Sequence, residues 1–249
     1  MTQSPAPPHV VSPPSTSIIA AAWGGGLLFT AALGYFLYAF LVRFGRPAVA
    51  GPVTAPIFVD LGLFSAFALH HSLFARPPLK ALVHRLLPLV LERSFYTWVA
   101  SALLIATCWW WQPVPGVLYV LPSGLEWLGI ATQAAGIVVT FAGSRAIDVL
   151  DLAGVRAVLL ARSARPASHV PLVTTGVYRV VRHPVYFGWA LFVFGAPTMT
   201  ATRMVFAVVS TAYLAIAIPW EEDSLIKTFG DDYRAYRSRV RWRMLPFVY

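Results

Sequence analysis

Long apolar runs separated by short polar segments dominate the sequence. Six apolar stretches are each compatible with a helical membrane crossing of about 20 residues. They cover residues 17–41, 57–74, 95–111, 125–143, 185–198 and 204–219. The fifth is short for a full crossing, and we expect it to pair with the sixth as a helical hairpin across the break at Pro197. The pattern predicts an all-α integral membrane protein with about five to six transmembrane helices.

Local composition divides the chain into three segments. Residues 1–16 are rich in Pro and Ser and are predicted to form a disordered tail. Residues 17–144 hold the first four predicted spans, and residues 145–249 hold the hairpin and most of the polar groups. The first span has no positively charged segment before it and exceeds the apolar core of a signal peptide. We therefore expect it to be a retained helix.

The overall composition supports the membrane assignment. Hydrophobic residues make up 58% of the chain and charged residues 12%, against about 25% charged in an average soluble domain. The formal net charge is +9, but the basic residues lie between apolar blocks. This favours the positive bias of membrane loops over nucleic-acid binding. The single cysteine, Cys108, lies in an apolar run and is expected to be a packed thiol rather than a nucleophile.

The basic residues also predict an orientation. All but three of the 19 Lys and Arg residues fall in the loop between the second and third stretches, the loop between the fourth and fifth, and the tail. Only Arg43, Arg46 and Arg203 fall on the opposite side. Because cytoplasmic loops carry the excess of Lys and Arg, we expect both termini in the cytoplasm, in a bacterial inner membrane.

Polar chemistry collects outside the predicted spans, in residues 148–184 and 219–246. The spans hold few ionisable groups, among them His70 and His71 at the end of the second and Glu126 at the start of the fourth. A transporter would place such groups near the middle of the bilayer. The hairpin brings both polar segments to one membrane face. We therefore expect a cytoplasmic cofactor pocket there, which a membrane-dissolved molecule reaches from the other side.

The first polar segment holds a compact motif over residues 175–186. Gly176 allows a backbone turn without a Cβ penalty. Pro184 suits the first helical turn, where its missing N–H is no loss. Arg182 and His183 would then lie at a helix N-terminus, which attracts a carboxylate. The alternative is a basic flank of a membrane span.

The second polar segment places three acids, Glu221, Glu222 and Asp223, directly after a span. This runs against the usual basic flank of a membrane helix. An ammonium, a ribose diol or a sulfonium would give these acids a partner. The alternative is a helix face paired with nearby Arg residues through i,i+4 contacts.

Taken together, the two segments resemble the membrane methyltransferases typified by isoprenylcysteine carboxyl methyltransferase and the phospholipid methyltransferases. The order and spacing hold over roughly 75 residues. The matching positions are Gly176, Tyr178, Arg182, His183, Pro184, Tyr186, Glu221, Glu222, Leu225, Gly230, Tyr233, Tyr236, Arg239, Val240, Leu245 and Pro246.

That resemblance implies an S-adenosylmethionine-dependent methyltransferase whose cofactor site comes from these segments. Pro171, Leu172, Val173 and Tyr178 would line the adenosine. The methionine end would be surrounded by His183, Pro184, Val185 and Tyr186, with Glu221 or Glu222 holding polar groups. Arg182 would be a further cofactor-binding residue.

Two departures from the family pattern concern the acceptor and the cofactor. The family's glutamine upstream of the first segment falls at Ser163. The arginine before the acidic pair, which is associated with the prenylcysteine substrate, falls near Ala217. The second departure weakens the case for a prenylated carboxylate acceptor.

A second resemblance covers more of the chain. Residues 67–77, 92–94, 111–113, 151–156 and 197–200 are similar to segments of the bacterial methanethiol S-methyltransferases. These use the same cofactor and a small thiol acceptor, and they are related to the NnrU-like membrane proteins. The acceptor is therefore either a small thiol or a lipophilic, isoprenylcysteine-like molecule dissolved in the membrane. The alternative function is that of a non-enzymatic NnrU-like protein with a transport or assembly role.

A thiol acceptor must ionise before it attacks, and a nearby cation or histidine helps it to do so. His71 and Arg76, at the predicted cytoplasmic end of the second span, are the candidate catalytic residues that line the acceptor pocket. The alternative for His71 is a hydrogen-bonded residue between helices. A metal site at His70 and His71 is not expected, because adjacent helical residues point about 100° apart and no carboxylate or Cys cluster joins them.

Overall fold

The computed structural model describes residues 14–74, 77–144, 149–163 and 171–249. Five of its helices are long and apolar enough to cross a membrane. They are α1 (Thr16–Tyr38, extended by a π-helical turn at Ala39–Arg43), α2 (Thr54–Phe74), α4 (Glu92–Trp110), α5 (Glu126–Ser144) and α9 (Ala201–Phe229). The predicted all-α integral membrane fold is confirmed.

Shorter elements connect these helices. Two strands, β1 (Val117–Val120) and β2 (Thr198–Thr200), pair antiparallel and were not predicted. The other elements are α3 (Pro77–Leu86), a 3-10 turn at Leu89–Leu91, α6 (Val149–Leu152), α7 (Arg156–Arg162), a 3-10 turn at Gly176–Arg179, α8 (Pro184–Phe194) and α10 (Asp231–Arg239).

The predicted hairpin is formed by α8 and α9, with two differences from the sequence-based bounds. Helix α8 has 11 residues, so it rises about 16 Å and cannot cross a hydrocarbon core of about 30 Å alone. Helix α9 does not end at Pro219, as predicted, but continues to Phe229. Proline removes one helical N–H and leaves the carbonyl of Ala215 without that donor. The hydroxyl of Tyr249 donates to this carbonyl at 3.4 Å.

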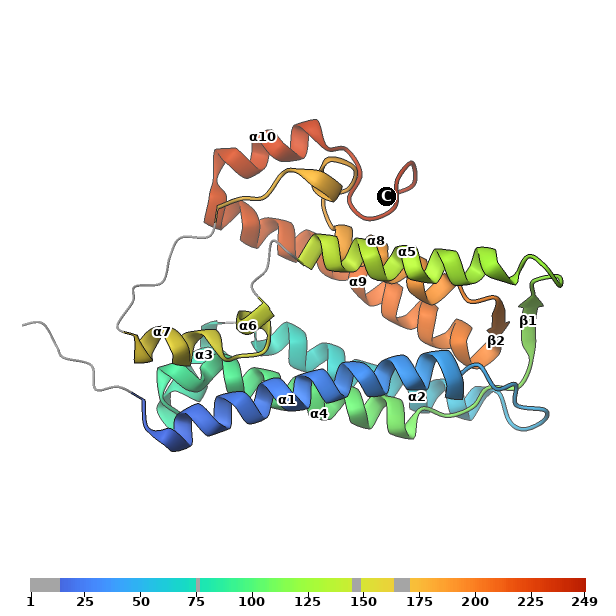
Figure 1. Cartoon of the computed structure of the whole chain (residues 1–249), viewed down its shortest axis with the longest axis horizontal. Helices are drawn as coiled ribbons and strands as arrows, with labels where there is room; N and C mark the ends of the chain where they lie inside the picture. The colour runs from blue at the N-terminus through green and yellow to red at the C-terminus, as the bar shows by residue number, and fades with distance from the viewer. Residues whose placement is uncertain (1–13, 75–76, 145–148, 164–170) are drawn as a thin grey trace, which may run out of the picture.

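The long helices form two layers (Figure 1). Helices α1, α2 and α4 make one layer, and α5, α8 and α9 make the other. The strand pair lies at one end of the bundle, and α10 lies at the other, which we call the α10 end; α1 begins at this end as well (Figure 1). A buried aromatic core joins the layers and includes Phe36, Phe40, Trp111, Phe192 and Phe206.

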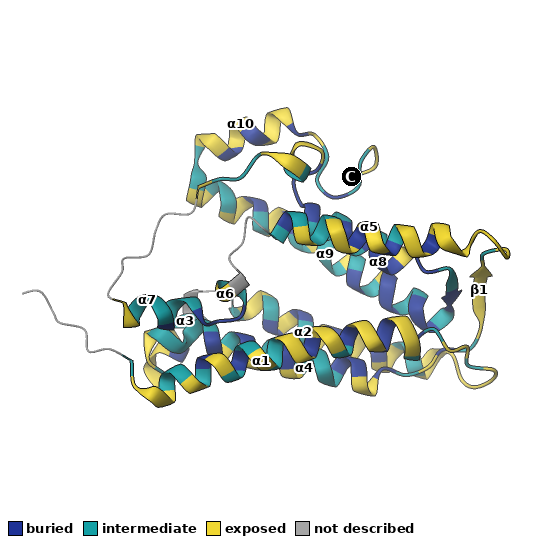
Figure 2. Cartoon of the chain, in the orientation of Figure 1, coloured by how far each residue is buried: buried dark blue, intermediate teal, exposed yellow. Residues whose placement is uncertain are grey.

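The outward faces of the helices are apolar and exposed. Figure 2 shows exposed residues along the outer sides of α1 and α5. They include Leu27, 71% exposed, and Phe141, 68% exposed. Exposed apolar surface of this extent is what a lipid-facing helix presents.

Helices α5 and α8 pack backbone to backbone. Gly136 of α5 faces Gly188 of α8, and a Cβ atom on Gly136 would lie 2.6 Å from the Gly188 carbonyl oxygen. Gly129 and Gly195 make a similar approach one heptad away. Small residues allow this close contact between helices in a membrane.

A buried arginine ties the two layers together at the strand end. Arg203, at the start of α9, donates to the carbonyl oxygens of Phe40 (3.0 Å), Leu41 (2.7 Å) and Thr198 (2.6 Å). Its guanidinium also lies over the Phe40 ring. The Arg203 guanidinium thus donates to backbone carbonyls that are left without a hydrogen-bond donor at the ends of other elements.

Residues 1–13 of the predicted N-terminal tail lie outside the described residues. Helix α1 begins at Thr16, and its N-cap Ser15 accepts a hydrogen bond from the Ile18 amide. Residues 145–148, at the expected boundary between the first four spans and the polar third, lie outside as well. That boundary stays a prediction.

Candidate active site

The motif predicted around Gly176 forms a turn that leads into α8. Gly176 has a φ of +62°, which favours glycine, and starts the 3-10 turn. Pro184 occupies the first turn of α8, as predicted, and His183 is the N-cap. The backbone amides of Arg182 and His183 donate to the carbonyls of Trp242 and Arg243 at 2.9 and 2.8 Å. The turn is therefore joined to the tail of the chain.

A buried ion pair forms the centre of the site. The Nε of Arg182 donates to Oε1 of Glu222 at 2.6 Å, and both side chains are at most 5% exposed. Arg182 also donates from Nη1 to the carbonyls of Val240 and Arg241. A buried ion pair is stable only when further polar contacts surround it. Here the two carbonyls serve Arg182, and the guanidinium groups of Arg237 and Arg243 lie 4.0 and 3.9 Å from Glu222 Oε2. Glu222 thereby joins α9 to both the α8 turn and the tail.

His183 lies between the two carboxylates. Its Nε2 is 3.4 Å from Glu222 Oε1, and its Nδ1 is 3.4 Å from Glu221 Oε2. Burial alone lowers the pKa of His183, but the hydrogen bonds and charges of Glu221 and Glu222 outweigh burial and raise this pKa above its ordinary value of 6.5. The site thus favours a cationic imidazole.

Glu221 is the accessible member of this cluster. Its side chain is 42% exposed, whereas that of Glu222 is 3% exposed. The Tyr186 hydroxyl donates to Glu221 Oε2 at 2.6 Å, and the Tyr186 ring stacks on that of His183. Among the described residues, no hydrogen bond reaches the other oxygen, Oε1. This half-exposed carboxylate therefore keeps one acceptor oxygen that the described residues do not use.

Two tyrosines of α10 form the wall of the site opposite Glu221. Tyr233 and Tyr236 are buried and pack against Leu172 and Tyr178, two of the residues predicted to line an adenosine. The Tyr236 hydroxyl donates to the Tyr178 carbonyl at 2.8 Å, and the Tyr178 hydroxyl donates to the Gly143 carbonyl. The Tyr233 hydroxyl is buried and has no hydrogen-bond partner among the described residues.

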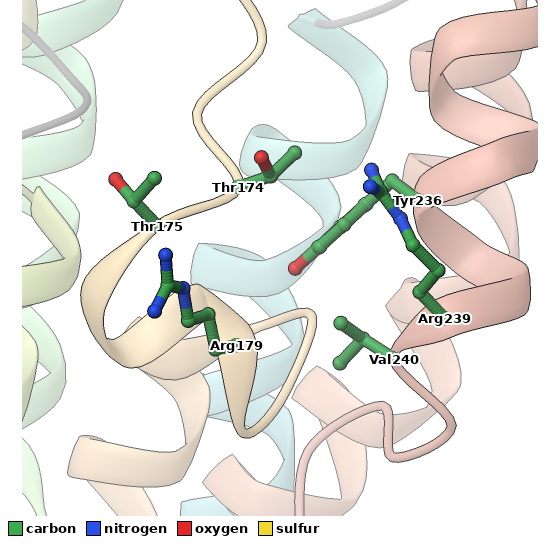
Figure 3. Close-up of a pocket in the computed structure, with 6 residues that line it drawn as sticks. All are labelled: Thr174, Thr175, Arg179, Tyr236, Arg239 and Val240. Carbon is green, nitrogen blue, oxygen red and sulfur yellow. The ribbon is translucent and has the colours of Figure 1, made fainter.

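A cavity of about 320 Å³ opens beside Tyr236. Figure 3 shows the side chains of Arg179 and Arg239 on either side of it, with the Tyr236 ring at its wall. The volume is at the lower end for small-ligand pockets. Its lining residues are Thr174, Thr175, Arg179, Tyr236, Arg239 and Val240.

The structure thus brings together most of the residues singled out from the sequence. Leu172, Tyr178, Arg182, His183, Tyr186, Glu221 and Glu222 surround one region at the α10 end. Pro171 is exposed, Val173 and Val185 are half-buried, and Pro184 is buried. That they bind a cofactor stays a prediction.

Of the two residues predicted to line the acceptor pocket, the structure describes one. His71 lies on α2, in the other layer, and its Nδ1 is 3.0 Å from the Tyr96 hydroxyl of α4. Arg76 lies outside the described residues.

Sequence reasoning missed several polar residues. Asp60 is fully buried in α2, where its Oδ1 accepts a hydrogen bond from the Gln112 amide at 2.7 Å. A single acidic residue inside an apolar stretch could have been recognised from the sequence, because such residues are rare in membrane spans. The contacts of Tyr96 with His71 and of Arg243 with His183 could not be predicted from the local sequence, because these partners are far apart along the chain.

Comparisons with known proteins identify the group to which the chain is similar. A family model described as phospholipid methyltransferase matches residues 126–232, from the first residue of α5 into α10. Methanethiol S-methyltransferase 2 of Bradyrhizobium diazoefficiens is 37% identical over 184 residues, 74% of this chain and 71% of the relative. Methanethiol S-methyltransferase of Mycobacterium tuberculosis is 35% identical, over 80% of this chain and 82% of the relative.

A more distant relative is the protein-S-isoprenylcysteine O-methyltransferase of Dictyostelium discoideum, 31% identical over 53% of this chain and 55% of the relative. No solved structure matches the chain. The first two relatives match through most of both chains, beyond the part that the family model covers. The chain belongs to the membrane methyltransferase family that includes the phospholipid, isoprenylcysteine and methanethiol methyltransferases.

Proposed function

We propose that this protein transfers the methyl group of S-adenosylmethionine to a small thiol within the membrane. The observation that carries the proposal is Glu221, which Tyr186 and His183 hold in place while its Oε1 stays unused by the described residues. The match to methanethiol S-methyltransferases, over 74% or more of the chain, supports the thiol. The isoprenylcysteine relative matches about half of the chain.

The chemistry of the site fits this cofactor. A cationic ammonium or a ribose hydroxyl has an acceptor in Glu221, and a carboxylate has cationic partners in the arginines of α10 and the tail. An adenine ring has apolar neighbours in the partly buried Tyr178 and Leu172, which pack on the buried Tyr233 and Tyr236. When bound, the cofactor supplies a methyl group on a positively charged sulfur.

The residues of this chain have a limited task in such a reaction. Methyl transfer from a sulfonium is an in-line displacement, which needs alignment and exclusion of water more than acid–base catalysis. Arg182 and Glu222 fix the α8 turn against α9 and the tail, and thereby fix His183 and Tyr186. Both partners then approach a rigid site, the cofactor from the α10 end and the acceptor from the bilayer.

The orientation also belongs to this proposal. Helix α1 begins at the α10 end (Figure 1), and α10 carries basic residues in its last turn. We assign this end to the cytoplasm of a bacterial inner membrane, because positively charged segments stay on that side. S-adenosylmethionine is then available from the aqueous phase.

The test incubates purified protein in detergent micelles with methyl-labelled S-adenosylmethionine and either methanethiol or a prenylcysteine analogue. We expect volatile labelled dimethyl sulfide with the thiol. The variant Glu221→Gln should bind the cofactor at least about 10-fold more weakly, because a charge-assisted bond is lost. Asp223→Asn, an exposed neighbour on the same helix, is the matched control and should bind as the wild type does.

Other outcomes separate the alternatives. A lipid-soluble, base-labile labelled ester would show the wrong acceptor class but the right cofactor. If the wild-type protein binds no labelled cofactor, the methyltransferase proposal fails, and the non-enzymatic NnrU-like role is favoured.

A further inference from the structure

A second polar cluster lies on the helices of the other layer, outside the cofactor residues. His71 of α2 and Tyr96 of α4 are joined by a 3.0 Å contact between Nδ1 and the hydroxyl oxygen. The His71 ring packs on Phe67, and the neighbouring His70 ring stacks on Tyr96. Both His70 ring nitrogens are buried without a partner among the described residues. Two adjacent histidines are unusual in an apolar membrane span.

The cluster reaches toward α9, the helix that carries Glu221. Tyr213 of α9 donates to the Ala68 carbonyl of α2 at 3.2 Å, and its hydroxyl is 3.3 Å from that of Ser72. Helix α9 therefore contacts α2 within one turn of His71 and carries Glu221 two turns further along.

We propose that His71 is the base that takes the proton of the thiol acceptor, and that Tyr96 positions it. The Tyr96 oxygen accepts the Nδ1 proton of His71, which leaves the lone pair of Nε2 for the thiol. This inference rests on the proposed function and adds the origin of the attacking thiolate.

A cation beside the pair strengthens this assignment. The Arg93 guanidinium lies 5.1 Å from the centre of the Tyr96 ring, its Nε donates to the Asp151 carbonyl at 3.1 Å, and the same Nε lies 3.8 Å from the Asp151 carboxylate. A positive charge near the acceptor sulfur favours a thiolate over a thiol.

The step balances as follows. The S–H bond of the acceptor breaks, its proton moves to Nε2 of His71, and the electron pair stays on sulfur. The sulfur pair forms a bond to the methyl carbon, whose bond to the sulfonium sulfur breaks and leaves its pair on that sulfur. The products are a thioether and S-adenosylhomocysteine, and the His71 proton is released to water after they leave.

The test compares two acceptors of the same skeleton, ethanethiol and the more acidic 2,2,2-trifluoroethanethiol. General-base catalysis contributes about 10²–10⁴-fold, so His71→Gln should lower kcat/KM for ethanethiol by about 100-fold or more. Loss with the trifluoro compound should stay below about 10-fold, because that thiol needs less help to ionise. Tyr96→Phe should show the same selective loss at smaller size.

Controls separate this inference from the proposed function. His84→Gln, on the exposed side of α3, should react with both thiols as the wild type does. Calorimetric binding of S-adenosylmethionine should be unchanged in His71→Gln. If that variant loses binding through misfolding, the ratio of the two thiols in Tyr96→Phe decides.

Equal losses with both thiols, or no loss with either, would overturn the assignment of His71 as the base. A wild-type protein that binds cofactor but methylates neither thiol would instead overturn the thiol acceptor of the proposed function.

Discussion

At the scale of single residues, the site is built from charges that need one another. Arg182 and Glu222 are buried within 2.6 Å, and His183 lies against both Glu222 and Glu221. An uncompensated charge at this depth costs about 3–5 kcal/mol. Each member therefore holds the others in place, and the carboxylate of Glu221 has a fixed direction.

This coupling predicts a pH dependence of stability. The pKa of His183 is raised above 6.5, so its contribution is complete below pH 6.5 and is lost as the pH rises through the folded-state pKa. We expect the thermal unfolding midpoint of cofactor-free protein in detergent to fall over this range more steeply in the wild type than in His183→Gln. Parallel curves for the two proteins would contradict the raised pKa.

At the scale of elements, the tail of the chain completes helix α9. Pro219 leaves the Ala215 carbonyl without its helical donor, and Tyr249 donates to that carbonyl. Arg243 donates to the same Tyr249 hydroxyl at 2.9 Å, while the Arg243 carbonyl accepts the His183 amide. The carbonyl that Pro219 leaves without a helical donor is thus where the tail of the chain docks on α9.

A double-mutant cycle tests this link. Tyr249→Phe should destabilise the protein by about 1 kcal/mol, because it leaves a carbonyl unbonded. In a Pro219→Ala background, the restored helical amide satisfies Ala215, and the same change should cost little. Thermal unfolding of the four proteins measures the coupling. Additive effects would show that Tyr249 acts elsewhere.

At the scale of the whole molecule, the two layers are joined by an aromatic core and by one buried arginine, Arg203. Arg203 bonds to carbonyls of both α1 and the segment before α9, and it does so at the end far from α10 (Figure 1). The family match to residues 126–232 covers the layer of α5, α8 and α9. The other layer holds His71 and Tyr96, on the acceptor side of the proposed reaction.

Removal of the Arg203 guanidinium should therefore weaken the contact between the layers. Arg203→Met leaves three carbonyls without a donor, and we expect a loss of about 2–3 kcal/mol. Arg46→Met, an exposed arginine at the same end, is the control and should unfold like the wild type. The comparison uses thermal unfolding in detergent, and equal midpoints for the two variants would contradict this role of Arg203.

The sequence predicted what depends on local pattern. Apolar runs identified the spans, and the order of Gly176, Pro184 and Glu221 identified the segments that meet in the site. It could not predict contacts between distant segments, such as Trp242 and Arg243 with the α8 turn. The end of α9 was misplaced because proline ordinarily stops a helix, and here a distant hydroxyl compensates.

The small size of α8 has a consequence for how the protein is made. A helix of 11 residues is too short to be stable in a bilayer by itself, and its glycines make close contacts only when α5 is already present. We expect α8 to enter the membrane after α5, together with α9, during biosynthesis. A bulky residue at Gly136 would then act first as a defect of membrane insertion, visible as a degraded chain rather than an inactive enzyme.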